Sequence, residues 1–123
     1  MSTLSLTKLI ICTNNPMVAP LIGAEYREES LLQVYYRVRD LVHRQYVLHT
    51  HPLAGSVKPN ETPYKSVALA AEPGSSLDLQ SLQLIEGAIQ VAERMLRERP
   101  LPAMSPKLLA DFALIDYSLM QAM

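Results

Sequence analysis

The stretch LTKLIICT, residues 6–13, decides our prediction of the fold because it is short, apolar and rich in β-branched side chains. It ends at three residues that favour turns, Asn14, Asn15 and Pro16. A short apolar run without alternating polar residues is typical of a strand that is buried on both faces, as in a parallel sheet. We therefore predict a buried strand over residues 6–13.

An amphipathic helix is predicted in SLLQVYYRVRDLVHR, residues 30–44. Ser30 and Gln33 have the spacing of a capping box, in which the two side chains satisfy backbone N–H groups of the first turn. His43 and Arg44 suit the C-terminal end of the helix dipole, which favours positive charge. The apolar residues that recur at the helical period are Leu31, Val34, Val38, Leu41 and Val42.

The segment YVLHT, residues 46–50, has the composition of a second strand. Strand, helix and strand in this order predict a βαβ unit with parallel strands and a right-handed crossover. Two further strands are predicted, a short edge strand in AEYRE, residues 24–28, and another in SVALAA, residues 66–71.

Two more helices are predicted in the second half of the chain, the first over residues 79–99. Ser105 followed by Pro106 is typical of an N-cap with proline at the first helical position, so a last helix begins there. Its predicted apolar face consists of Leu108, Leu109, Phe112, Ile115 and Leu119. Residues 1–123 are thus predicted to form a single α/β domain, a small layered fold with a mostly parallel sheet and about three packed helices.

Composition narrows the class of partner. Apolar residues make up 49% of the chain and charged residues 19%, which is an ordinary balance for a globular domain. The formal net charge is −1, and the 11 Lys and Arg residues are scattered rather than clustered. We therefore expect no nucleic acid and no membrane among the partners, because neither would be attracted by such a charge distribution.

The single cysteine and the N-terminal segment indicate the cellular compartment of the protein. Cys12 is the only cysteine, so no intrachain disulfide can form, which favours a reducing compartment. The N-terminal segment lacks the basic region and continuous apolar core of a signal peptide. No apolar run approaches the roughly 20 residues of a membrane helix. We expect a soluble protein of the cytoplasm.

The candidate functional region is THPLAGSVKPNETPYK, residues 50–65, a polar loop with three prolines. A loop of this length in a compact domain is usually functional or mobile, and the prolines argue against simple mobility. The alternative is a rigid connector whose polar groups bond to their own backbone. Lysines here could bind an anion with backbone amides, or could simply be solvated.

If the first strand and residues 46–50 run parallel, their carboxyl ends share the edge of the sheet where ligands usually bind. The predicted ligand- or partner-binding residues are Thr13, Asn14, Asn15, Thr50, His51, Ser56, Lys58, Asn60, Glu61, Tyr64 and Lys65. If the protein is an enzyme, His51 and Glu61 are the predicted catalytic residues. His49 and His51 would share a face of a strand, but no third ligand completes a tetrahedral set, so we predict no metal and no cofactor.

Three stretches resemble the GrdX family: LIICTNNP, VRDLVHR and, above all, THPLAGSVKPNETPYKSV. The resemblance continues through SLQLIEGAI and DFALIDYSLM and so covers most of the chain. Members of this family accompany the glycine, sarcosine and betaine reductases of amino-acid-fermenting bacteria. The chain departs from the family pattern near Gln45 and His49, where a glycine and an apolar residue are expected. This departure weakens any metal site at His49 and leaves open whether the chain serves a reductase.

Two functions remain open from the sequence. The first is an accessory or interaction protein that presents residues 50–65 to a reductase-complex protein, which the resemblance implies. The second is a small-molecule-binding protein or enzyme, whose site is formed by residues 13–16 and 50–65 and takes an unidentified small molecule or anion. We also predict a homo-oligomer, because the last helix carries apolar residues on more than one face.

Overall fold

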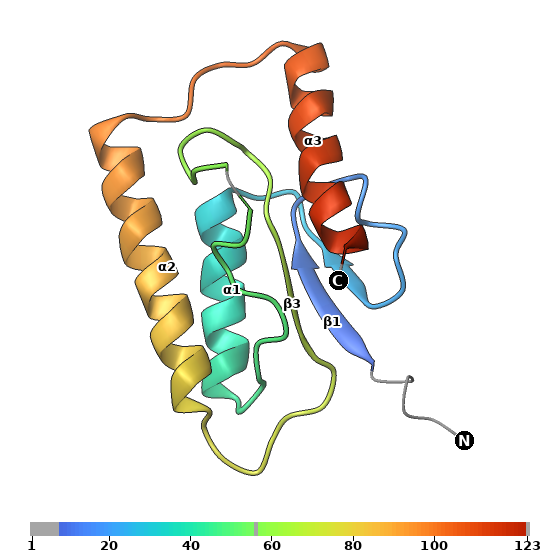
Figure 1. Cartoon of the computed structure of the whole chain (residues 1–123), viewed down its shortest axis with the longest axis vertical. Helices are drawn as coiled ribbons and strands as arrows, with labels where there is room; N and C mark the ends of the chain where they lie inside the picture. The colour runs from blue at the N-terminus through green and yellow to red at the C-terminus, as the bar shows by residue number, and fades with distance from the viewer. Residues whose placement is uncertain (1–7, 56, 123) are drawn as a thin grey trace.

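The structure is a computed structural model that describes residues 8–55 and 57–122 of the chain. Its elements are β1 (Leu9–Thr13), β2 (Ala24–Tyr26), α1 (Leu31–His43), β3 (Ser66–Ala70), α2 (Leu79–Glu98) and α3 (Pro106–Gln121). Figure 1 shows α1 and α2 on one side of the sheet and α3 on the other side. A linker passes over one end of the sheet and joins the two layers.

The sheet is mixed, with β1 at its centre. β1 pairs in parallel with β2 on one side and antiparallel with β3 on the other. The predicted α/β class is therefore confirmed, but the predicted mostly parallel sheet is wrong. The physical reason is that β3 leaves the long loop and runs back along β1, so that Thr13 at the end of β1 faces Ser66 at the start of β3.

The predicted strand over residues 46–50 does not form. The predicted βαβ unit, with a parallel crossover from β1 to that strand, is therefore also wrong. Leu48 makes a single antiparallel bridge to Leu69, on the edge of β3 that faces away from β1. Regular pairing stops there because the Ala68 N–H bonds to the Thr50 hydroxyl, at 3.0 Å, instead of a backbone carbonyl. The segment is an irregular border of the sheet.

The other strands agree with their predictions. β1 begins at Leu9, and the predicted positions Leu6 and Thr7 lie outside the described residues. Its Ile11 and Cys12 point to opposite faces and are both buried, as expected for a strand covered on two sides. β2 and β3 occupy the stretches predicted for the edge strand and the further strand.

The predicted spans of α1 and α2 and the predicted start of α3 are confirmed. At α1 the Ser30 hydroxyl accepts from the Gln33 N–H at 3.1 Å, and the Gln33 side chain accepts from the Ser30 N–H at 2.9 Å. At α3 the Ser105 hydroxyl accepts from the Leu108 N–H at 3.2 Å, and Pro106 is the first helical residue. These bonds satisfy donors that a helix start otherwise leaves free.

The end of α1 holds Gln45 in a left-handed backbone conformation. Gln45 has a φ of +76°, in the left-handed region that favours glycine. Its N–H donates to the Val42 carbonyl at 2.9 Å, and the Tyr46 N–H donates to the Leu41 carbonyl at 3.0 Å. These are the two bonds of a Schellman motif, whose left-handed residue is usually glycine. Glycine is therefore the residue that this backbone position favours.

The face of the sheet toward α1 and α2 carries the larger apolar core. Cys12 and Val67 pack there against the buried side of α1, and α2 covers α1 from outside. The buried residues of this core are Cys12, Leu31, Val34, Tyr35, Val38, Val42, Val67, Leu69, Ile85, Ala88, Ile89 and Ala92.

The opposite face carries a smaller cluster under α3, formed by Ile11, Val18, Ala68 and Met120. The predicted apolar face of α3 is wrong, because the buried residues of the helix are Ala113, Asp116 and Met120. At the start of β3 the sheet presents Ser66, whose N–H and hydroxyl donate to Asp116, so a carboxylate fits against the sheet there. The predicted stripe is turned sideways toward the long loop, and its Leu108 and Ile115 are 41% and 43% exposed.

Candidate functional site

Asn14 joins the two loops that the sequence predicted to meet. Its side-chain amide donates to the carbonyls of Glu29 and Pro63, at 2.9 and 2.8 Å, and its side-chain oxygen accepts from the Lys65 N–H at 2.8 Å. The meeting arises from the antiparallel pairing of β1 and β3, which brings the end of the long loop beside Asn14. The contact between residues 13–16 and the long loop was predicted from parallel strands. The contact is present, but it forms through the antiparallel pairing of β1 and β3.

A buried polar network lies behind Asn14 and is centred on Asp116 of α3. The carboxylate accepts hydrogen bonds from the Ser66 N–H at 3.1 Å, the Ser66 hydroxyl at 2.7 Å and the Asn15 side-chain amide at 2.9 Å. The Ser66 hydroxyl also lies 2.7 Å from the Thr13 hydroxyl. Asp116 is only 5% exposed, so these donors replace water around its charge. The network fastens α3 to the ends of β1 and β3.

Lys65 is buried beside this network. Its ammonium donates to the Ala54 carbonyl at 3.0 Å, and its exposed fraction is 8%. Burial lowers the pKa of Lys65, and the negative charge of Asp116 opposes that shift. Among the described residues, no ion pair within 4.0 Å joins the Lys65 ammonium to the Asp116 carboxylate. A small cavity of about 60 Å³ lies here. Its lining residues are Thr50, His51, Ala54, Lys65, Ser66, Asp116, Leu119 and Met120.

His51 lies at the rim of that cavity and is exposed. Its Nδ1 accepts from the Leu53 N–H at 3.0 Å, which leaves Nε2 to carry the proton of the neutral ring. The loop then packs on α3 at Gly55, where φ is +96° and a Cβ atom would lie 2.7 Å from Leu119 Cδ1. The first half of the loop is therefore held against both β3 and α3.

The second half of the loop forms a tight turn that uses its own polar groups. The Lys58 N–H donates to the Glu61 carboxylate at 3.0 Å, and the Glu61 N–H donates to the Lys58 carbonyl at 2.9 Å. Asn60 is buried in the turn and reaches the C-terminal end of α2. Its side-chain amide donates to the carbonyls of Met95 and Arg99, at 3.2 and 3.3 Å.

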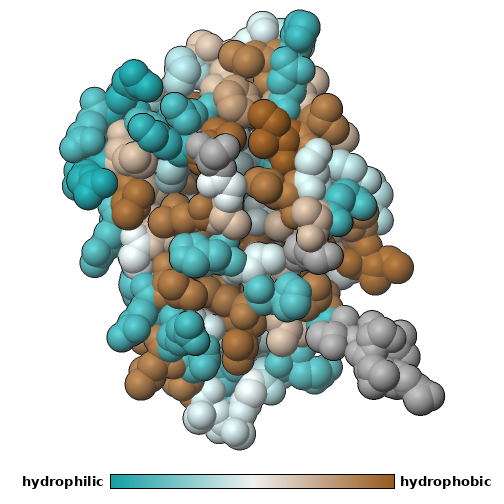
Figure 2. All heavy atoms as spheres, in the orientation of Figure 1, coloured by the Kyte–Doolittle hydropathy of each residue, from teal (hydrophilic) through white to brown (hydrophobic). Residues whose placement is uncertain are grey.

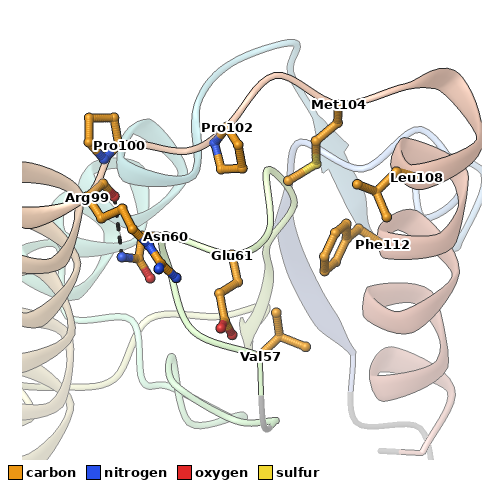
Figure 3. A pocket seen from close by; sticks show the side chains of 9 residues that line it. All are labelled: Val57, Asn60, Glu61, Arg99, Pro100, Pro102, Met104, Leu108 and Phe112. Atoms are coloured by element: carbon orange, nitrogen blue, oxygen red, sulfur yellow. Dashed lines mark hydrogen bonds between the residues drawn. The ribbon is translucent and has the colours of Figure 1, made fainter.

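This turn forms one wall of an open groove of about 640 Å³ (Figure 3). The linker after α2 passes over the groove, and α3 forms the opposite wall. Apolar side chains dominate the lining, and Figure 2 shows apolar surface gathered between the ends of α2 and α3 nearest the linker. The lining residues are Val57, Asn60, Glu61, Arg99, Pro100, Pro102, Met104, Leu108 and Phe112.

The structure therefore divides the predicted site residues into two groups. Thr13, Asn14, Asn15 and Lys65 join the buried network, and Thr50 and His51 lie at its edge. The turn residues Asn60 and Glu61 line the groove instead, and no described cavity is lined by both His51 and Glu61.

Of the remaining predicted site residues, Lys58 and Tyr64 belong neither to the buried network nor to the lining of the groove. The Tyr64 N–H donates to the Thr62 hydroxyl at 3.1 Å, and the half-buried Tyr64 ring lines a narrow cavity beside α3. Lys58 is exposed, and Ser56 lies outside the described residues.

Sequence reasoning missed Asp116, which is the centre of the network. A charged residue on a terminal helix suggests a solvated face. The available signal was its position, three residues after Ala113 and four before Met120, on one side of the helix. The linker residues of the groove were missed because prolines between two helices indicate only a break.

Neither a metal cluster nor a membrane span is found among residues 8–55 and 57–122. No three His, Cys, Asp or Glu side chains there are grouped so that they could hold a metal ion. None of the described helices is long and apolar enough to cross a membrane. Cys12 is buried as predicted, and burial raises the pKa of its thiol to about 11.

Residues 10–123 match the family model of the GrdX-like protein, which covers nearly the whole chain. The chain belongs to the GrdX-like protein family. This finding confirms the resemblance seen in its loop and helix motifs. No curated protein and no solved structure matches it. The matched span of this GrdX-like protein includes both the buried network and the groove.

Proposed function

We propose that this GrdX-like protein is a non-catalytic accessory protein of glycine, sarcosine or betaine reductase metabolism. It binds a reductase-complex protein through the surface formed by residues 50–65 and α3. The observation that carries the proposal is the apolar groove of about 640 Å³, which is open to solvent. Apolar clefts of several hundred Å³ with a few polar groups are typical binding sites.

The polar side chains that could do chemistry support the same conclusion. Asn14 and Asn15 use their amides to hold the fold together, and Glu61 bonds within its own turn. His51 lines a different cavity from Glu61, so the pair that an enzyme would need does not converge. A preorganised loop without such convergence suits recognition, because its rigidity lowers the entropic cost of binding.

The test uses purified subunits of the three reductases from an organism that encodes this protein. The wild-type chain, immobilised, is expected to bind at least one subunit in a biosensor assay. Val57→Asp places a charge in the groove wall and is expected to weaken binding by about tenfold or more. Leu79→Asp is the matched control, because Leu79 is 65% exposed on α2 and does not line the groove. Absence of binding to every subunit would refute the accessory role.

The alternative function, a small-molecule site, is favoured by one specific observation. The 60 Å³ cavity brings the buried ammonium of Lys65 beside Thr50, His51 and Asp116. Burial lowers the pKa of Lys65, and ionisable residues with shifted pKa values cluster at functional sites. Under this alternative, glycine, sarcosine, betaine or inorganic phosphate raises the melting temperature of the wild type, and His51→Ala abolishes the rise. If the accessory role is correct, His51→Ala leaves subunit binding nearly intact, because His51 does not line the groove.

A further inference from the structure

The linker between α2 and α3 passes along the groove and is flanked by extended residues. Arg99 and Ser105, which flank it, have extended conformations with φ, ψ of −151°, 104° and −68°, 159°. Each of Pro100 and Pro102 also holds the residue before it in an extended conformation. Among the described residues, no backbone group of 101–104 takes part in a hydrogen bond. This segment therefore has the free donors and acceptors of an unpaired strand edge.

The two prolines make the two edges of this segment unequal. Successive N–H groups of an extended chain point to opposite sides, so Leu101 and Ala103 donate on one side. On the other side Pro100 and Pro102 have no N–H, and only Met104 can donate. An added strand would thus find regular donors on a single edge, as in natural edge strands that carry proline on the unpaired side.

Asn60 supplies a second polar group, an unpartnered acceptor on the groove wall. Its NH₂ group donates to the Met95 and Arg99 carbonyls, which fixes the amide orientation because both neighbours are acceptors. The side-chain oxygen therefore faces away from the end of α2, and it is buried without a hydrogen-bond partner. A buried acceptor without a donor is costly, typically about 1–3 kcal/mol. Arg99, which also lines the groove, is exposed.

The apolar wall on the far side of the groove is formed by α3 and the loop. Leu108 is 41% exposed, Phe112 is half-buried, and Val57 and Met104 complete the wall. Val57 and Phe112 also line the narrow cavity next to it, so the apolar surface continues along α3 toward Leu119. One large apolar side chain of a ligand would cover the exposed parts of these residues.

We propose that the groove binds an extended peptide segment of the partner protein, in the manner of an added β-strand. The segment pairs its backbone with Leu101 and Ala103, donates one N–H to the side-chain oxygen of Asn60, and inserts a large apolar side chain against Leu108 and Phe112. This inference rests on the proposed function, in which the groove is the working surface. The backbone groups of a bound helix would already be hydrogen-bonded within the helix and would not pair with the linker. An extended segment can pair with the linker and also fill the apolar groove, so we favour it.

The experiment titrates the ¹⁵N-labelled full chain with capped hexapeptides that differ only at one central residue, which is phenylalanine, leucine, aspartate or glycine. The phenylalanine and leucine peptides are expected to shift the amide signals of Val57, Leu101 and Ala103 in a saturable way. The aspartate and glycine peptides are expected to bind about tenfold more weakly or worse. Methylation of the central peptide nitrogen should weaken binding by a similar factor, because it removes a hydrogen bond.

Two variants complete the design. Leu108→Ser, at a partly exposed position that tolerates the change, is expected to weaken the phenylalanine peptide by about tenfold, whereas Leu79→Ser is expected to leave it unchanged. No saturable shift with any peptide would overturn the proposal. Equal binding of the methylated peptide would also overturn it, because the ligand would then use apolar contact alone. If a reductase subunit binds and all peptides fail, this inference is refuted and the accessory role stands. If peptides bind and all subunits fail, only the accessory role is refuted.

Discussion

The face of the sheet that carries α1 and α2 buries apolar side chains, whereas the face that carries α3 buries a carboxylate together with its donors. On the first face Val67 and Leu69 contact a continuous apolar cluster. On the second face Ser66 and Asn15 donate to Asp116, and the apolar cluster beside them is small. Hydrophobic burial is non-directional, whereas hydrogen bonds fix geometry. We infer that the first face supplies stability and that the second positions α3 and, with it, the groove.

Leu69→Ala should have the largest effect on stability, because Leu69 is fully buried in the larger cluster. Removing such a side chain leaves a cavity and costs about 3 kcal/mol of unfolding free energy. Urea unfolding followed by circular dichroism measures the loss. Leu79→Ala, at a side chain that is 65% exposed, is the control and should change stability by less than about 0.5 kcal/mol. A small loss at Leu69 would mean that this face does not carry the stability.

The thiol of Cys12 should make the apolar face sensitive to alkaline pH. Its pKa rises from 9.0 to about 11 in the folded protein because the thiolate would be buried. The unfolded chain therefore loses this proton first, and the corresponding stability is present below pH 9 and lost between pH 9 and 11. The stability advantage of wild type over Cys12→Ala, from urea unfolding across this range, should shrink by up to about 2.7 kcal/mol. An advantage that does not change with pH would contradict this environment for Cys12.

Ser66→Ala should weaken the polar face by a moderate amount. The change removes the bonds of the Ser66 hydroxyl to Asp116 and Thr13, both 2.7 Å long. A bond to a charged acceptor contributes about 1.5–3 kcal/mol, and we expect a loss near the lower value because the Ser66 N–H still donates to Asp116. Ser118→Ala removes an exposed hydroxyl from α3, the helix that carries Asp116, and should have almost no effect in the same urea assay. Equal losses for the two serines would remove the distinction between buried and exposed bonds.

Gln45→Gly should have the smallest effect, a gain in stability. Gln45 occupies the left-handed position of a Schellman motif with a φ of +76°, which costs a non-glycine residue about 1–2 kcal/mol. The greater flexibility of glycine in the unfolded chain offsets part of the gain, so about 0.5–1 kcal/mol remains. Thermal unfolding checks the sign. A loss of stability would show that the Gln45 side chain makes a contact that matters more than its backbone strain.

Local sequence signals predicted the elements well, because they act within a few residues. The capping box of Ser30 and Gln33 and the Ser105–Pro106 start depend only on near neighbours in the chain. The strand order depends on contacts between distant segments. The composition of residues 46–50 suits a strand, yet β3 takes the place beside β1, and Leu48 is left with a single bridge.

The candidate site was only partly predicted, because it also depends on contacts between distant segments. Asn14 was correctly expected to lie beside the long loop, and its side-chain oxygen accepts from the Lys65 N–H at the end of that loop. Asp116 could not be assigned a role, because nothing near it in the sequence reveals that three buried donors face it. The groove was likewise hidden, since its walls come from three segments that only the fold brings together.

The most direct test of this account is native-state hydrogen exchange of Asp116→Asn, compared with wild type and with Asp111→Asn. The asparagine keeps the shape of Asp116 but offers an N–H where a buried donor needs an acceptor. Asp111 is an exposed residue on the same helix and provides the control. We predict that α3 amides of Asp116→Asn exchange about 100-fold faster, equivalent to roughly 2.7 kcal/mol, while α1 amides change little. Equal acceleration in α1 and α3, or none in either, would contradict the claim that this network positions α3 and the groove.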